Sequence, residues 1–227
     1  MFNFVDVEYD NMEEPSVVER NGQRFYKFPS VDDYYPSVTT VTGIRSRESI
    51  AKWRARVGEE EANRVSARAS SRGSQFHAIL EEHIKGTLDE QKYQKHPLAL
   101  NMFKMARKTL LRVDNIHALE TPLYSHVFGL AGRVDCIAEF DKELAVIDFK
   151  TSTKDKRESY IENYFVQESA YAAMFYERTG IKVKKIVTLI ATEEGSIQVF
   201  QKYNLDDYLQ LLKSYKEEFN ALQSQGR

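Results

Sequence analysis

The sequence predicts an α/β protein in which a mixed central β-sheet is flanked by helices. Two observations predict this class. Apolar residues recur at the helical period within residues 48–117, and from residue 118 the period changes to two, which is that of a strand. From there the patterns run as three strands, a helix, two strands and a helix. Strands that follow one another without a helix pair antiparallel, so the sheet is mixed rather than doubly wound and parallel.

The length and composition are those of an ordinary soluble protein. The chain has 227 residues, of which 42% are hydrophobic and 29% charged, so it can bury one sizeable core. We expect a single domain over residues 1–227, with a helical region at about 31–117, a sheet core at about 118–203 and a C-terminal helix at 204–227. The net charge of −2 excludes no class of partner, because positive charge can still be concentrated locally.

Cysteine usage and the start of the chain indicate the compartment. Cys136 is the only cysteine, which excludes a disulfide within the chain and a four-cysteine zinc or iron–sulfur site. No apolar run approaches the roughly 20 residues of a membrane span. The acidic start MFNFVDVEYDNMEEP resembles neither a secretory signal nor a transit peptide. We therefore expect a cytoplasmic protein without a membrane partner.

The N-terminal half is expected to hold one short strand and a long helical region. The segment QRFYKFPS at 23–30 is typical of a short strand, and the hydroxyl-rich segment at 34–43 is expected to be extended. Residues 48–86 show a helical pattern with a break expected near SSRGS at 70–74. A further helix is expected over about 97–117.

The C-terminal half supplies the sheet. Short segments rich in β-branched residues alternate with turn residues, and the helical pattern between them ends at Gly180. The expected strands lie near 118–127, 132–140, 143–151, 182–191 and 196–203, and the expected helices cover about 160–178 and 205–222.

The stretch LAVIDFKTS at 144–152 places two charges inside a strand that otherwise looks buried. Because side chains alternate along a strand, Asp148 and Lys150 share one face and lie ~7 Å apart. Charged side chains avoid full burial unless they are paired or bind a metal ion. The pattern alone is explained equally well by an ion pair on an exposed face and by a functional site.

The preceding strand carries a second carboxylate, Asp135. If the turn is symmetric about residues 141–142, Phe140 faces Glu143 and Asp135 lies opposite Asp148, with Cβ atoms ~5 Å apart. Two carboxylates this close require a proton on one of them or a cation between them, and an all-oxygen pair suits Mg²⁺ or Mn²⁺. A loop of odd length would instead put the two aspartates on opposite faces.

These groups have the parts that metal-assisted hydrolysis of a phosphodiester needs. A cation makes a nucleophile of water, and an ammonium group such as that of Lys150 holds a phosphate oxygen or polarises the water. His77, in the helical segment RGSQFHAILEEH, borders an apolar stripe one turn before Glu81. A histidine in such a place is either packed against the core or a ligand, and imidazole suits Mn²⁺ or Zn²⁺ better than Mg²⁺.

Five motifs follow one another along the chain: RGSQFH with His77, LETPL with Glu120, GRVDC with Asp135, VIDFKTS with Asp148 and Lys150, and QESAY with Gln167 and Tyr171. Their order resembles that of the PD-(D/E)XK nuclease superfamily and, within it, of the RecB-like branch. The order and spacing agree over about residues 34–176, although each motif alone is weakly specific. The segment YPSVTTV also resembles the start of small single-domain members of the branch, such as mitochondrial genome maintenance exonucleases and phage-type single-strand exonucleases.

The resemblance implies a metal centre and a catalytic lysine. Lys150 is expected to position the attacking water. The expected ligands of Mg²⁺ or Mn²⁺ are His77, Asp135, Asp148 and the backbone carbonyl of Phe149.

The resemblance implies supporting roles for three more residues. Gln167 and Tyr171 lie one helical turn apart and are expected to steady the active site or the scissile phosphate, although packing on the sheet explains them too. Glu120 is expected to be auxiliary rather than a ligand. Some relatives carry four cysteines around an iron–sulfur cluster, which this chain with its single Cys136 lacks.

A basic segment with an aromatic residue is the candidate substrate-binding region. Between Arg45 and Arg72, eight basic residues are interrupted by only four acids, and the only tryptophan lies among them. Such a segment suits phosphates and a stacked base, but a solvated helix face with internal ion pairs has the same composition. Ser37 or Thr39 can likewise bind phosphate or only cap a turn. The expected substrate-binding residues are Ser37, Thr39, Trp53, Arg72 and Arg133.

Together these features predict a Mg²⁺- or Mn²⁺-dependent deoxyribonuclease, most simply a single-strand-preferring DNA exonuclease of replication, recombination or repair in a bacterial or phage-infected cell. By the resemblance, residues 31–117 form an arch over single-stranded DNA that has a free end. Two other classes remain open. One is a structure-specific flap endonuclease, and the other is a non-catalytic DNA-end-binding module that serves a helicase or recombination partner.

Overall fold

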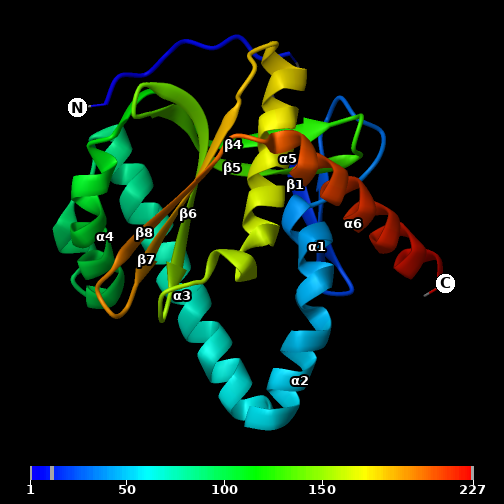
Figure 1. Ribbon diagram of the computed structural model, residues 1–227, viewed down its shortest axis with the longest axis horizontal. Helices are drawn as coiled ribbons and strands as arrows, with labels where there is room; N and C mark the ends of the chain where they lie inside the picture. The colour runs from blue at the N-terminus through cyan, green and yellow to red at the C-terminus, as the bar shows by residue number, and fades with distance from the viewer. Residues whose placement is uncertain (1, 11–12, 226–227) are drawn as a thin grey trace.

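The computed structural model describes residues 2–10 and 13–225 and has a five-stranded sheet at its centre (Figure 1). Strands β6 and β7 run parallel, because a helix crosses between them, and the other neighbours are antiparallel. The predicted α/β fold with a mixed sheet is confirmed. The strand order is β4 (Val113–Ser125), β5 (Leu130–Phe140), β6 (Glu143–Ser152), β7 (Lys185–Thr192) and β8 (Ile197–Lys202).

Helices cover both faces of this sheet. Phe76 of α3 packs in one apolar cluster with Ile147 of β6, and Phe175 of α5 packs in another with Val146. Since neighbouring residues of a strand point to opposite faces, the sheet separates two core layers. The principal helices are α2 (Arg47–Val57), α3 (Glu59–Lys85), α4 (Pro97–Leu110), α5 (Glu162–Thr179) and α6 (Leu205–Gln225).

A small N-terminal sheet precedes the helices. Its strands are β1 (Ser16–Arg20), β2 (Gln23–Lys27) and β3 (Tyr35–Pro36), and they pair antiparallel. The strand predicted at 23–30 is confirmed as β2, whereas β1 was not predicted. Its sequence SVVER has one apolar pair and two charges, and it forms an edge strand that is mostly exposed.

The prediction of an extended segment at 34–43 is wrong beyond residue 37. Residues Val38–Thr42 form the short helix α1, followed by the 3₁₀ turn η1 (Gly43–Ser46). The Ser37 hydroxyl accepts a hydrogen bond from the Thr40 backbone N–H at 2.9 Å, which caps the helix. The β-branched threonines favour strands only weakly, and this cap together with burial of Val38 and Val41 outweighs that preference.

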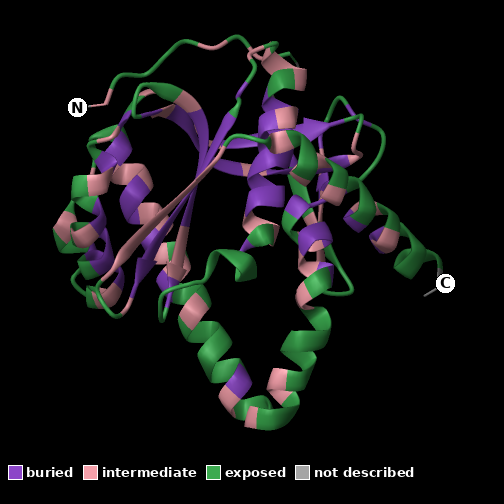
Figure 2. Ribbon diagram, viewed as in Figure 1, coloured by how far each residue is buried: buried purple, intermediate pink, exposed green. Residues whose placement is uncertain are grey.

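The predicted helix break near residues 70–74 is also wrong. Helix α3 runs through that stretch without interruption, and the break falls at Gly58, between α2 and α3. Gly58 has φ = 88°, a conformation that glycine adopts without steric cost, so the chain reverses there. Helix α2 and the first half of α3 therefore make a V-shaped projection (Figure 1), and Figure 2 shows that most of its residues are exposed.

Helix α4 is shorter than the helix predicted over 97–117. It ends at Leu110, and β4 begins at Val113. Val113 and Ile116 are buried in the core, and Val113 pairs with Phe140 of β5, so sheet pairing overrides the local helical pattern. Among the described residues, none of the helices combines the length and the apolar character that a membrane span requires.

The hairpin that carries the predicted carboxylates has the predicted register. Phe140 pairs with Glu143 and Ile137 with Val146, on either side of a turn at 141–142. Both turn residues have positive φ, 56° at Asp141 and 68° at Lys142, as a two-residue hairpin turn that follows the strand twist requires. Beyond the last paired residues, Cys136 and Ile147, this register places Asp135 and Asp148 on neighbouring strands.

Candidate metal centre

Three side chains from three different elements meet beside the sheet. His77 comes from α3, Glu120 from β4 and Asp135 from β5, and one ligand atom of each lies within 4.8 Å of the others. The Nδ1 atom of His77 lies 3.6 Å from Asp135 Oδ1 and 3.8 Å from Glu120 Oε1. Two carboxylates and an imidazole in this arrangement are a donor set for a divalent cation.

Glu120 lies in the same cluster as His77 and Asp135, and its predicted auxiliary role stays a prediction. It lies between two ladder pairs, Leu119 with Cys136 and Thr121 with Val134, and so falls opposite Asp135. Its φ of 48° is unusual for a residue other than glycine, and such conformations persist where the surrounding structure holds them. The sequence holds a signal for this position. The residue-by-residue pairing that was predicted for β5 and β6 could have been extended to β4, where it would have placed Glu120 opposite Asp135.

Asp148 is buried one strand further on and is held by two partners. Only 1% of its surface is exposed. Gln167 donates a hydrogen bond from Nε2 to Oδ1 at 3.1 Å, and Lys150 forms an ion pair with Oδ2. Asp148 does not belong to the group of three ligand atoms, although Asp135 joins the two strands by accepting a hydrogen bond from the Phe149 N–H at 2.8 Å.

The charges of the site determine its proton affinities. Burial lowers the pKa of His77, but Asp135 and Glu120 outweigh this and raise it to about 9. Burial raises the pKa of Asp148 to about 6, against the lowering effect of Lys150. Burial alone would lower the pKa of Lys150, yet the carboxylates of Asp148 and Asp135 hold it above its ordinary value, so the ammonium stays charged at neutral pH.

The cluster opens into a cavity of about 720 Å³ that can admit a substrate. Most of the residues that line it have polar or charged side chains, which is the character of a site for a charged ligand rather than an apolar one. The predicted residues that line it are Ser37, Thr39, His77, Glu120, Arg133, Asp135, Lys150, Gln167 and Tyr171.

The ligand atoms of the cluster and the cavity beside them both fit a divalent metal ion. His77, Glu120 and Asp135 would hold it, with the cavity leaving positions for water or substrate. The two carboxylates suit Mg²⁺ or Mn²⁺, and the imidazole favours Mn²⁺ of the two. The predicted roles of Asp148 and of the Phe149 carbonyl as further ligands stay predictions.

Helix α5 presents its two motif residues to the cavity. Gln167 and Tyr171 are both buried, and Gln167 fixes the Asp148 carboxylate. Tyr171 packs on Gly132 of β5, where an added Cβ would lie 2.6 Å from the tyrosine Oη. The absence of a side chain at position 132 is therefore what lets α5 approach β5 so closely.

Two of the predicted substrate-binding residues lie outside the cavity. Arg72 is buried, forms an ion pair with Glu193 and donates from Nε to Thr151 Oγ1 at 3.1 Å. Trp53 is half-buried on α2. Arg133 does line the cavity, but its guanidinium donates to the Glu120 carbonyl and pairs with Glu14.

The N-terminal sheet contributes residues that sequence patterns did not single out. Glu19, Arg24 and Tyr26 from β1 and β2 line the same cavity. A further unpredicted residue is Glu168, fully buried on α5, which accepts a hydrogen bond from Thr188 Oγ1. Burial is the main cause that raises the pKa of Glu168 well above its ordinary value. The motif that contains Gln167 did not predict that the neighbouring carboxyl group of Glu168 is buried.

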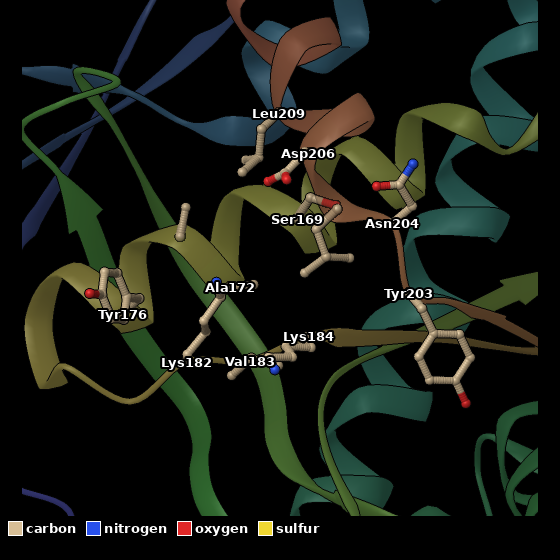
Figure 3. A pocket seen from close by; sticks show the side chains of 12 residues that line it. Ser169, Ala172, Tyr176, Lys182, Val183, Lys184, Tyr203, Asn204, Asp206 and Leu209 are labelled. Atoms are coloured by element: carbon tan, nitrogen blue, oxygen red, sulfur yellow. The ribbon is translucent and has the colours of Figure 1, made fainter.

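A separate cavity of about 410 Å³ lies away from the metal centre (Figure 3). It is bounded by α5, the segment at 182–184 and the start of α6, with Ala172, Val183 and Leu209 among its lining. None of the predicted site residues lines it. Its mixed apolar and charged wall holds no group of metal ligands among the described residues.

Comparisons with known proteins agree with the geometry. Residues 47–225 match the sequence model of the PD-(D/E)XK nuclease superfamily. Human mitochondrial genome maintenance exonuclease 1 is 25% identical over 183 residues, which cover 75% of this chain and 53% of that protein. The Xenopus tropicalis protein of the same name is 30% identical over 156 residues, covering 65% of this chain and 44% of its own. The chain thus spans about half the length of the curated relatives it matches.

A solved structure is also similar in outline. The putative exonuclease from Eubacterium rectale aligns with a TM-score of 0.46 at 14% identity, covering 65% of this chain and 68% of that one.

Proposed function

The chain belongs to the PD-(D/E)XK nuclease superfamily, and from this premise we propose that it is a Mg²⁺- or Mn²⁺-dependent DNA exonuclease that prefers single strands with a free end. One observation carries the proposal. The ammonium of Lys150, paired with Asp148, lines the same cavity as the ligand atoms of His77, Glu120 and Asp135. A lysine and a metal-binding cluster around one open cavity are what hydrolysis of a phosphodiester requires.

The residues of the chain divide the work as follows. A divalent cation at the cluster supplies positive charge that activates water and offsets the charge of the phosphate. Lys150 lines the cavity, where its ammonium would orient water and stabilise negative charge that develops on phosphate oxygens. Asp148 keeps Lys150 in place, and Gln167 keeps Asp148 in place through the hydrogen bond to Oδ1.

Hydroxyl groups in the cavity wall support the proposal that this cavity binds the DNA strand. Ser37 and Thr39 line the cavity, and their hydroxyl oxygens lie 3.0 Å apart. The Ser37 hydroxyl already caps α1, so Thr39 is the freer donor for a phosphate oxygen. This division of labour refines the sequence-based expectation, in which both residues were assigned to the substrate.

The exposed projection of α2 and α3 supports the preference for single strands. None of the α2 residues is buried, so the projection has surface free for a partner. Arg47 and Arg56 are exposed there and have no ion-pair partner among the described residues. By the family resemblance, this region arches over the strand, and a flexible single strand would follow it more readily than a rigid duplex, which is the basis of the proposed preference.

The test is a comparison of end-labelled linear and circular single-stranded DNA, digested with Mg²⁺ or with Mn²⁺. We expect linear strands to be degraded and circles to resist. Circles cut at the same rate would reject the requirement for an end, and cleavage confined to branched duplexes would identify a flap endonuclease. Binding without any cleavage would identify a DNA-end-binding module. RNA strands of the same sequence, added in parallel, decide the sugar preference.

A further inference from the structure

A second, smaller cavity shares part of its wall with the cavity of the metal centre. Its volume is about 310 Å³, and Glu19, Arg24 and Thr39 line both cavities. The remaining wall comes from the β1–β2 turn, α1 and the start of α2. The residues that line it are Glu19, Gly22, Gln23, Arg24, Thr39, Thr40, Gly43 and Arg47. A ligand that extends from the metal centre past Arg24 would enter this space.

The positive charge of this cavity is available for a ligand. Arg24 and Arg47 have no carboxylate within 4.0 Å among the described residues. On the neighbouring helix α3, by contrast, Arg64 pairs with Glu61 and Arg72 with Glu193. Guanidinium groups free of carboxylate partners are the usual means of binding phosphate.

Backbone contacts hold Arg24 in position. Its N–H donates to Thr40 Oγ1 at 3.1 Å, and its carbonyl accepts from the Ser37 N–H at 2.8 Å. These bonds tie β2 to the capped start of α1, so the base of the Arg24 side chain is placed by two elements. The residue therefore lies on a rigid support, which lowers the entropy cost of binding.

The carboxylate of Glu19 lies in the same cavity wall and would oppose the binding of an anion, which gives a further test. Glu19 pairs directly with Arg24 in the β1–β2 ladder and lines both cavities. It makes no ion pair with Arg24 within 4.0 Å. A bound phosphate would meet repulsion from Glu19, so removing its charge has an opposite effect to removing that of Arg24.

We propose that Arg24 and Arg47 bind a phosphodiester of the substrate strand next to the scissile one, which makes the N-terminal sheet part of the substrate track. The inference rests on the proposed function for the identity of the strand. The family match begins at residue 47, so it assigns no role to β1 or β2. The ligand class is the phosphate of a nucleic-acid backbone, read through charge and not through base identity.

The experiment measures binding of a fluorescent oligothymidylate to metal-free protein by anisotropy over a series of salt concentrations. We expect Arg24→Ala and Arg47→Ala each to weaken binding about tenfold. Each should also reduce the slope of log affinity against log salt by about 0.7, the value for one phosphate contact on a single strand. Glu19→Gln should tighten binding.

Two further variants keep the result interpretable. Arg20→Ala is the matched control, because Arg20 is an exposed arginine of the same small sheet that packs over Tyr34 and lines neither cavity. Arg24→Lys keeps the charge and should retain the wild-type salt slope, even if Arg24→Ala disturbs folding. In cleavage assays, the kcat/KM penalty of Arg24→Ala should shrink as the oligonucleotide is shortened.

The outcomes separate the two proposals. If wild-type protein degrades DNA and Arg24→Ala has the salt slope and affinity of Arg20→Ala, the phosphate site is refuted and the nuclease stands. If wild-type protein binds with an Arg24-dependent slope and degrades nothing, the nuclease proposal fails and the phosphate site stands. Weaker binding by Glu19→Gln would contradict an anionic ligand.

Discussion

At the residue scale, the centre of the site is the buried ion pair of Asp148 and Lys150 on β6. Burying either charge alone is costly, and one partner left without the other destabilises the fold strongly. The pair is therefore stable only as a unit, with Gln167 satisfying a further lone pair of Asp148. This arrangement positions an ammonium group beside the cluster of His77, Glu120 and Asp135.

Replacing Lys150 tests its catalytic role. Lys150→Ala should lower kcat at least about 100-fold, because a positioned charge is lost from the transition state, while DNA affinity stays near that of the wild type. Rates are measured with a labelled single strand, and binding in metal-free buffer. Lys154→Ala, an exposed lysine just beyond β6, is the control.

The ion pair makes a second variant necessary. Lys150→Ala leaves the buried Asp148 without its partner, so thermal unfolding must be recorded beside the rates. Lys150→Met keeps the apolar stem and should be inactive as well. Cleavage at the wild-type rate by a folded Lys150 variant would remove this residue from the mechanism.

The protonation of His77 predicts how metal binding depends on pH. Its pKa of about 9 lies above the ordinary value of 6.5, so the metal-free imidazole is protonated at neutral pH. Below 6.5 this proton contributes its full stabilisation to the metal-free fold, and the contribution is lost as pH rises through about 9. A metal ion must displace the proton, so Mn²⁺ affinity should rise with pH up to about 9.

Calorimetry checks this prediction directly. Mn²⁺ titrations in buffers of different ionisation enthalpy should show proton release at neutral pH, and His77→Ala should lose most of that release. An affinity that stays constant across the neutral and mildly alkaline range, with no proton release, would show that His77 is not a ligand.

Sequence patterns located most of these residues for physical reasons. Alternation along a strand put Asp148 and Lys150 on one face, and the hairpin register brought Asp135 beside Asp148. The place of Glu120 in the cluster was missed because only the pairing of β5 with β6 was predicted. The pairing of β4 with β5 could have indicated it, although the left-handed backbone conformation at Glu120 has no local pattern. The pairing of Arg72 with Glu193 was out of reach because the two are far apart in the chain.

At the scale of elements, the approach of α5 to β5 determines where the motif residues lie. Tyr171 rests on Gly132, and an added Cβ there would lie 2.6 Å from Oη and 2.8 Å from Cε1 of the ring. Both residues are within the wall of the catalytic cavity. A glycine in the middle of a strand is normally unfavourable, so its presence here reflects this close contact.

Gly132→Ala should therefore destabilise the fold by about 1–3 kcal/mol through overpacking. Urea unfolding of metal-free protein measures the change. Gly73→Ala in α3, where the nearest atom to an added Cβ is Thr151 Oγ1 at 3.8 Å, should instead be neutral or stabilising. Adding Tyr171→Ala to Gly132→Ala should cost less than the sum of the single changes, and strict additivity would show that the two do not couple.

Element positions followed from the sequence where the period was long and clear. The strands of the central sheet, α5 and α6 were placed within a few residues. The errors fall where local sequence signals compete. Ser37 caps a helix in a threonine-rich segment that was expected to be extended. Gly58, with positive φ, breaks the helix where Gly73 does not, and the pairing of Val113 with β5 ends α4 early. Each was settled by a tertiary contact or a backbone conformation outside the reach of hydrophobic periodicity.

At the scale of the whole molecule, a core of the PD-(D/E)XK superfamily carries two additions. The projection of α2 and α3 extends from the body (Figure 1), and the small N-terminal sheet forms part of the cavity wall. The arch over 31–117 was inferred only through the family resemblance and stays a prediction. The small sheet was partly missed because β1 is short and polar. These additions are where substrate preference would be determined.

Trp53 reports on the projection, since it is the only tryptophan of the chain. If a base stacks on it, single-stranded DNA should quench its fluorescence, and Trp53→Ala should weaken binding about tenfold, in line with one stacked base. The control is Tyr176→Ala, an exposed aromatic residue beside the separate cavity. No spectral change at saturation, with affinity equal to that control, would exclude stacking at this position.

The most direct test of the account is an anomalous difference map from a crystal of the protein soaked in Mn²⁺. The account predicts a peak at coordination distance, about 2.0–2.6 Å, from side-chain atoms of His77, Glu120 and Asp135, with the Lys150 ammonium beside it in the same cavity. A fully occupied Mn²⁺ site elsewhere, with these side chains turned away from one another, would contradict it.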